Sequence, residues 1–166
     1  MAIRTIREIG EAVLEKKSKV IPEITPRIRT LAEDMLETMY EACGVGLAAP
    51  QVGILKRMFV IDITPDASEP YVLINPEILE TSGEQTGNEG CLSVPGKSGL
   101  VTRPNYAKVK ALNLDGEEFI LEGEELLARA ILHEYDHLDG ILYTTKVEGP
   151  LQDVNYEEPE EDDMEE

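Results

Sequence analysis

Both histidines of the chain lie four residues apart in the pentapeptide HEYDH, at His133 and His137. In an α-helix, residues i and i+4 share one face, so two imidazoles at this spacing reach one metal ion. Glu134, between them, points aside and is placed to accept a proton from water at the metal. Leu126 and Ala130 extend the same face, which predicts a buried site. The pattern therefore indicates a hydrolytic metal centre on a helix, with a hydrogen-bonded histidine pair as the alternative.

A catalytic metal site of this kind needs a third protein ligand and one open position. Cys91, in the segment EGCLS, is the candidate, because thiolates bind zinc- and iron-type ions well. A lone cysteine is also a common small core residue. For Cys43, at the end of the first expected helix, core packing is the better interpretation.

The segment GVGLAAPQ, residues 44–51, matches the GxGxxA pattern of dinucleotide-binding loops. Such a loop follows a strand and opens a helix, whereas this segment follows an expected helix and meets Pro50, so we reject a dinucleotide site. The glycines instead allow the backbone to approach a substrate chain closely. Gln51 is then placed to donate its amide to a developing oxyanion. A glycine-rich connector without function is the alternative.

One clear amphipathic helix stands near the N-terminus. Its expected range is 25–43, with Thr25 as N-cap, Pro26 in the first turn and Gly44 directly after the end. Apolar residues spaced by three and four form one stripe. Asp34 belongs to the opposite face, which we expect to be exposed to solvent.

The middle of the chain changes to strand-type patterns. Strands are expected over four ranges: 57–63, 71–74, 107–114 and 118–121. Asp115-Gly116 predicts a two-residue hairpin turn between the last two. A second helix, expected over residues 124–137, carries HEYDH. This order indicates the α+β class: a single domain over residues 1–150, with antiparallel strands packed around the C-terminal helix.

The formal net charge of −19 is unevenly distributed. Eight of the last ten residues are acidic, and without them the charge is −11. The tail, residues 151–166, is poor in apolar residues, and we expect it to be mobile. An acidic body without a basic stripe argues against direct binding to DNA or RNA. No apolar run is long enough for a membrane span and no secretory signal is recognisable, so we expect a cytoplasmic protein with reduced thiols.

Three segments, GVGLAAPQ, EGCLS and HEYDH followed by Leu138-Asp139-Gly140, resemble the signatures of the peptide deformylase family and occur in the family's order. The resemblance covers nearly everything except the acidic tail. It implies hydrolytic removal of the formyl group from N-formylmethionine at the start of new polypeptides, in a bacterial-type cytoplasm or an organelle. It implies one divalent metal ion per chain, Fe²⁺ in the cell, which Zn²⁺, Ni²⁺ or Co²⁺ can replace. Its partners would be N-formylmethionyl peptides and nascent chains, with transient proximity to the ribosome.

The same resemblance implies a role for individual residues. The metal ligands would be Cys91, His133 and His137. The catalytic groups would be Glu134 as general acid/base, with Gln51 and the backbone N–H of Leu92 holding the oxyanion. Gly46 and Glu89 match positions beside the peptide chain. From their places near the motifs, we expect the methionine pocket to be lined by Val45, Leu126 and Ala130.

Two positions depart from the family pattern. Leu132 stands where the family commonly has Gln, which predicts altered hydrogen bonding around the metal ligands. The segment Pro95-Gly96-Lys97-Ser98 lacks the arginine that some members place near the substrate. These departures bear on substrate preference and efficiency more than on the type of reaction.

Two rival functions use the same residues. One is a different metal-dependent amidase or peptidase with the same ligand set. The other is a metal-binding or interaction protein without activity that uses its acidic tail as a contact. Glu134 and Gln51 argue against the second, because a purely structural metal site requires neither.

Overall fold

The computed structural model describes residues 2–154. It contains two α-helices, α1 (Pro26–Glu41) and α2 (Leu126–Leu138), and three 3-10 turns, η1 (Ala12–Glu15), η2 (Ala49–Val52) and η3 (Tyr143–Thr145). Within residues 2–154, no helix is long and apolar enough to cross a membrane.

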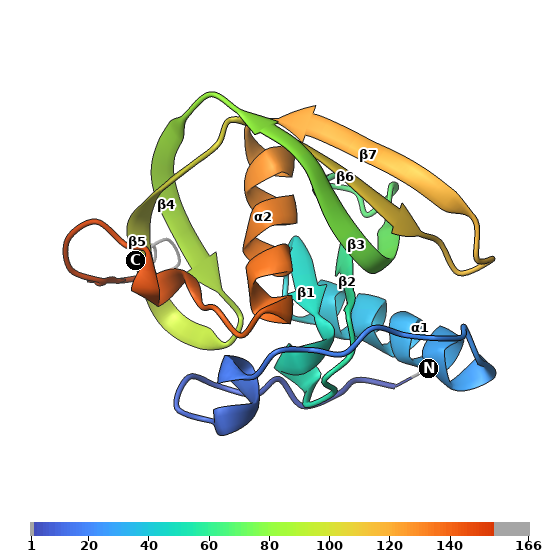
Figure 1. Ribbon diagram of the computed structural model, residues 1–166. Coiled ribbons are helices and arrows are strands. Elements are labelled where there is room, and N and C mark those ends of the chain that lie inside the picture. The colour runs from blue at the N-terminus through green and yellow to red at the C-terminus, as the bar shows by residue number, and fades with distance from the viewer. Residues whose placement is uncertain (1, 155–166) are drawn as a thin grey trace.

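Two antiparallel sheets flank α2, which lies between them (Figure 1). The larger sheet has the order β1-β2-β3-β6-β7, with strands β1 (Gly46–Ala48), β2 (Met58–Ile61), β3 (Tyr71–Ser82), β6 (Tyr106–Leu112) and β7 (Glu118–Glu124). The smaller sheet has the order β4-β5-β8, with strands β4 (Gln85–Cys91), β5 (Val94–Arg103) and β8 (Gln152–Asp153). The α+β class and the helix at the centre of the strands are confirmed.

The core lies on both faces of the larger sheet. On one face, Ile131 and Leu138 of α2 pack against Phe59 and Leu73, and all four side chains are fully buried. On the other face, the apolar stripe of α1, including Met35, packs against β1 and β2. Burying these aliphatic side chains fixes α2 in place, and the site residues on α2 are fixed with it.

Helix α1 begins as its sequence predicts. The Thr25 hydroxyl accepts a hydrogen bond from the backbone N–H of Ile28 at 3.3 Å, and Pro26 occupies the first turn. The expectation for Asp34 was wrong, because its side chain is buried. Its carboxylate accepts the backbone N–H of Ala2 at 2.7 Å and pairs with Arg4 at 2.9 Å, so it fastens the N-terminal segment to the helix.

Several strand features differ from the expectations, among them β1, which was not expected, and β3, which continues to Ser82 instead of ending at residue 74. Strands β4 and β5 were not anticipated, because their glycines and polar residues interrupt the alternation that marks a half-buried strand. The β6–β7 turn has three residues between Asn113 and Glu117, with Gly116 at φ 79°, instead of two. Pairing continues past residue 150, where we expected the tail to begin, because β8 pairs with Lys97 and Ser98 of β5. The rest of the expected tail, 155–166, lies outside the described residues.

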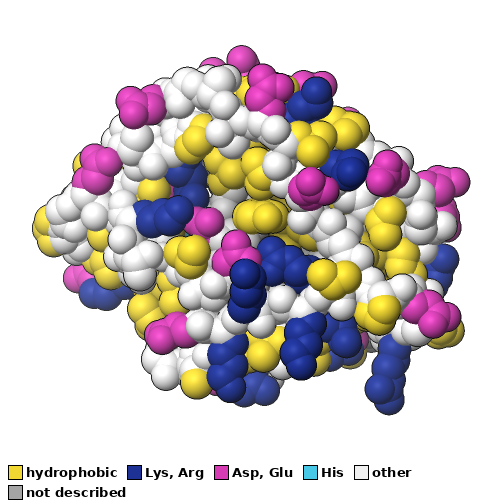
Figure 2. Space-filling view, in the orientation of Figure 1, with side chains coloured by type: hydrophobic (Ala, Val, Ile, Leu, Met, Phe, Trp, Pro, Cys, Tyr) yellow, Lys and Arg dark blue, Asp and Glu magenta, His cyan; other side chains and the backbone are white. Residues whose placement is uncertain are grey.

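The charge on the surface is segregated. Nine of the fifteen Lys and Arg residues lie within residues 1–57. Figure 2 shows basic side chains gathered over the lower part of the molecule, where Figure 1 places the N-terminal segment, while acidic side chains line the upper and right edges. The net negative charge alone did not predict this separation.

Candidate active site and metal centre

Helix α2 carries three of the predicted site residues on its buried side. His133, Glu134 and His137 are buried, with exposed fractions of 7%, 4% and 1%. The two imidazole rings stand edge to face with centroids 5.0 Å apart, as the i, i+4 spacing dictates. The helix therefore brings the predicted histidine pair together inside the fold.

Cys91 reaches the same point from the end of β4. Its Sγ lies 3.3 Å from Nε2 of His137, and ligand atoms of Cys91, His133 and His137 all lie within 4.8 Å of one another. One thiolate and two imidazoles form a donor set suited to divalent transition metals, with room for a further ligand. The residues present thus fit a mononuclear metal centre.

Glu89 in β4 holds the first histidine in position. Its buried carboxylate accepts a hydrogen bond from Nδ1 of His133 at 2.9 Å and is held from the other side by Arg103 and by Nη1 of Arg129, the latter at 2.7 Å. Burial opposes ionisation, but the hydrogen bonds from His133 and Arg103 outweigh it and lower the pKa of Glu89 to about 2. With Nδ1 engaged, Nε2 of His133 is left to face a metal. Glu89 also lines the pocket where the peptide is expected, while its carboxylate is bonded to His133.

Glu134 faces a pocket with one oxygen free of partners. Its Oε1 is buried and has no hydrogen-bond partner among the described residues. A Cβ on Gly46 would lie 2.5 Å from Oε2, so only glycine at position 46 leaves room for this carboxylate. Burial raises the pKa of Glu134 to about 7. A carboxyl group that titrates near neutrality is suited to accepting and returning a proton.

The side-chain amide of Gln51 has a fixed orientation. Its Oε1 accepts the backbone N–H of Ala48 at 2.9 Å, which leaves the amide nitrogen pointing into the site. This Nε2 donates to the Ser93 hydroxyl at 3.0 Å and lies 3.5 Å from the Cys91 sulfur. Ser93 is fully buried and was missed by the sequence analysis, although its place two residues after the predicted cysteine ligand was a usable signal.

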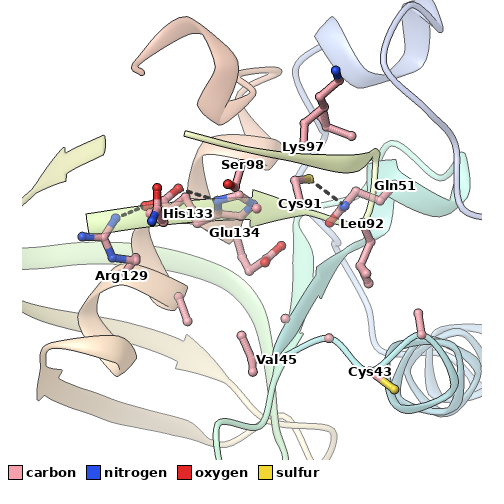
Figure 3. Close-up of a pocket in the computed structure, with 18 of the residues that line it drawn as sticks. Cys43, Val45, Gln51, Cys91, Leu92, Lys97, Ser98, Arg129, His133 and Glu134 are labelled. Atoms are coloured by element: carbon pink, nitrogen blue, oxygen red, sulfur yellow. Dashed lines mark hydrogen bonds and ion pairs between the residues drawn. The ribbon is translucent and has the colours of Figure 1, made fainter. Parts of the chain in front are cut away.

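A pocket of about 410 Å³ opens beside these groups (Figure 3). The residues predicted for the methionine pocket, Val45, Leu126 and Ala130, all line it, as do the two predicted beside the peptide, Gly46 and Glu89, and also Gln51 and Leu92. Val45 and Leu126 are 41% and 48% exposed, and exposed apolar side chains at the mouth of a cavity are typical of a binding site. The sequence analysis missed several lining residues, among them Asn88, Arg129 and Val154.

The expectation that Cys43 packs in the core was wrong. Its side chain is exposed and lines the pocket. Cys43 also adopts the positive φ, 60°, that ends α1, a conformation we expected at Gly44. Gly44 instead leaves room for Leu92, because a Cβ there would lie 2.8 Å from Cδ1 of Leu92 and would displace the end of that side chain.

The two departures from the family pattern have different settings. Leu132 packs among the apolar side chains between α2 and the larger sheet, whereas the observed hydrogen bond to His133 Nδ1 comes from Glu89. Nδ1 of His133 thus has its partner, whereas the buried Nδ1 of His137 has none among the described residues. Ser98 does line the pocket, next to Lys97, whose Nζ pairs with Asp153 of β8 at 2.5 Å.

Known proteins share both the sequence and this architecture. A model of the family described as polypeptide deformylase matches residues 3–152. A peptide deformylase of Lachnoclostridium phytofermentans is 62% identical over 163 residues, which is 98% of this chain and 100% of that protein. The crystal structure of a Legionella pneumophila peptide deformylase superposes with a TM-score of 0.86 at 44% identity, over 88% of this chain and 86% of that one. A Synechococcus elongatus peptide deformylase, solved in complex with actinonin, superposes with a TM-score of 0.83 at 42% identity, over 87% of this chain and 78% of that one.

Proposed function

The chain belongs to the polypeptide deformylase family and is an enzyme of that family, and from this premise we propose the reaction that it performs. It hydrolyses the N-terminal formyl group of formylmethionyl peptides and releases formate, with nascent chains in a bacterial-type cytoplasm as its substrates. The observation that carries the proposal is the unpartnered Glu134 carboxyl, buried beside a Cys-His-His donor set at the edge of a pocket.

The substrate peptide is proposed to bind as an extended strand. Among the described strands, β1 and β4 each stand at the edge of their sheet, and both contribute residues to the pocket. Strand edges offer unpaired backbone groups that hydrogen-bond an added peptide. The methionine side chain then enters the apolar part of the pocket at Val45, Leu126 and Ala130. Gly46 allows the peptide backbone to come close to Glu134.

Cys91, His133 and His137 would hold the metal. A divalent ion bound there supplies Lewis-acid stabilisation and lowers the pKa of a water molecule. Glu89 fixes the tautomer and the orientation of His133 for this task, through the 2.9 Å bond to Nδ1. We propose Fe²⁺ in the cell, with Zn²⁺, Ni²⁺ or Co²⁺ as substitutes, because this ligand set accepts several divalent ions and availability decides between them.

Proton transfer and charge stabilisation fall to two side chains and one backbone group. Glu134 accepts a proton from the attacking water and gives it to the departing amine, as its near-neutral pKa allows. The fixed amide nitrogen of Gln51 and the backbone N–H of Leu92 stabilise the oxyanion that forms at the formyl carbon. The Gln51 amide would exchange its bond to Ser93 or its contact with Cys91 for the oxyanion.

Formate release from formyl-Met-Ala-Ser tests the proposal. Protein prepared without air is assayed beside the Glu134→Ala variant, a chelated sample and acetyl-Met-Ala-Ser. We expect rapid release from the formyl peptide, with loss of activity in the variant and the chelated sample and little hydrolysis of the acetyl peptide. Comparable hydrolysis of the acetyl peptide would support a broader amidase, and no release from fully metallated protein would refute the proposal.

A further inference from the structure

The lining of the pocket includes a buried charged side chain, that of Arg129. Arg129 follows Leu126 by three residues on α2 and precedes Ala130 and His133, so these side chains share one helical face and all line the pocket. Figure 3 shows Arg129 extending from α2 past His133, away from the Gln51 end of the site. A pocket for an apolar side chain would not require a guanidinium at this point.

The guanidinium of Arg129 is held firmly by β4 and β5. Its Nη1 donates to Glu89 at 2.7 Å and to the carbonyls of Val101 at 3.3 Å and Gly87 at 3.5 Å, and its Nη2 donates to the Gln85 side chain at 3.2 Å. Arginine has five N–H groups, and no described residue accepts a hydrogen bond from its Nε. The Nε–H of Arg129 is therefore still able to donate a hydrogen bond, and Arg129 lines the pocket.

Gly87 in β4 makes space for this arrangement. A Cβ at position 87 would lie 3.3 Å from Nη2 of Arg129, closer than ordinary contact. Position 87 thus adds no apolar side chain opposite the guanidinium. The pocket lining thus combines exposed apolar side chains, Val45 and Leu126, with the buried guanidinium-bearing side chain of Arg129.

We propose that Arg129 extends the substrate range to N-formyl peptides whose first side chain ends in a hydrogen-bond acceptor, specifically methionine sulfoxide. The inference rests on the proposed deformylase function. In a wholly apolar pocket the sulfoxide oxygen would lose its hydrogen bonds with water and gain none, which disfavours binding. Beside Arg129 the oxygen accepts a charge-assisted hydrogen bond instead.

The reaction remains the same hydrolysis. The bond between the formyl carbon and the amide nitrogen breaks, water supplies the hydroxyl group of formate, and a proton goes to the new amine. The sulfoxide is not reduced and serves only in recognition. No reactant beyond water is needed.

Three formylated tripeptides that differ only in the first side chain test the role of Arg129. They are formyl-Met-Ala-Ser and its analogues with norleucine or methionine sulfoxide at the first position. Norleucine replaces the sulfur by a methylene and cannot accept a hydrogen bond. In the wild-type enzyme we expect kcat/KM for the sulfoxide peptide within about tenfold of that for the norleucine peptide. In Arg129→Leu, we expect the sulfoxide-to-norleucine ratio to fall by about 10- to 100-fold, because the acceptor is then buried without a partner.

Leu126→Ala is the matched control on the same helical face. It removes apolar contact at the mouth without touching the guanidinium, so it should lower all three kcat/KM values and leave the ratio within about twofold. Should Arg129→Leu fail to fold, Gly87→Ala displaces the guanidinium by crowding Nη2 and should lower the same ratio.

The inference is overturned by a wild-type sulfoxide rate below about one hundredth of the norleucine rate. It is also overturned by an unchanged ratio in the folded Arg129 variant, or by an equal fall of the ratio in Leu126→Ala. These outcomes leave the proposed function intact as long as formyl-Met-Ala-Ser is hydrolysed. Absence of formate from all three peptides would refute the deformylase proposal itself, and this inference with it.

Discussion

Replacing Glu89 by glutamine tests how the metal site is supported without changing any of the proposed metal ligands. The carboxylate is 4% exposed and meets three donors: His133, Arg103 and Arg129. Glutamine keeps the shape but removes the charge, and its amide group turns one acceptor into a donor facing a guanidinium. Breaking a buried ion pair costs about 3–5 kcal/mol, so we expect a loss of this order in the free energy of unfolding.

The same change should weaken metal binding. His133 Nδ1 would lose its ionised acceptor, and losing such an outer partner of a ligating histidine costs about 10- to 100-fold in metal affinity. Urea unfolding measures the first effect, and competition with a chelator for Co²⁺ or Zn²⁺ measures the second. Asp136→Asn is the matched control, because the Asp136 carboxylate pairs with Arg103 and with Lys146, each at 3.1 Å, and makes no hydrogen bond or ion pair with His133 among the described residues.

The two readouts decide what Glu89 does. A variant that is destabilised, yet binds metal as tightly as wild type while folded, would show that the Glu89–His133 bond does not position the ligand. Equal weakening of metal binding by Asp136→Asn would have the same consequence, because the effect would then come from the charge of the cluster. A folded Glu89→Gln enzyme with unchanged stability would refute the energetic argument.

Three further changes have defined outcomes. Gln51→Leu should lower kcat by roughly 10²–10³-fold if its amide stabilises the oxyanion, and steady-state kinetics showing an unchanged kcat would remove that role. Gly46→Ala should abolish most activity while the protein stays folded by circular dichroism, because the new Cβ meets Oε2 of Glu134 at 2.5 Å; full activity would mean that this carboxylate moves freely. Asp62 is buried, which raises its pKa, but hydrogen bonds from Thr64 and Tyr40 outweigh burial and leave it lowered. The ionised Asp62 carboxylate therefore stabilises the fold above its unfolded-state pKa, and this stabilisation is lost as pH falls through its folded-state pKa. Asp62→Asn lacks this term, so its free energy of unfolding, measured with urea below about pH 4, should fall less with decreasing pH than that of the wild type.

Local patterns identified those parts of the fold that depend on neighbours in sequence. Thr25 caps α1 because a hydroxyl three residues before an open N–H acts over one helical turn. The apolar stripe on α1 and the short apolar runs in β2 and β3 likewise lie within a few residues of sequence. Strands β4 and β5 escaped because their sequences, QTGNEGC and VPGKSGLVTR, carry glycines where contacts from α2 and the C-terminal segment fill the space. Those contacts join residues that are far apart in sequence, so local sequence patterns do not indicate them.

The same distinction explains which site residues were found. His133 and His137 lie four residues apart on one helix, so their spacing alone indicated that both could bind one metal ion. Glu89 and Arg129 are separated by 40 residues and meet only when β4 packs beside α2. The resemblance to the family therefore gave Glu89 only a place beside the peptide, and no sequence pattern singled out Arg129. The outer partners of a metal site come from whichever elements the fold places behind the ligands, and charge pairing there leaves no periodic trace in the sequence. What the sequence does retain is the glycine at position 87, whose missing side chain gives Arg129 its room.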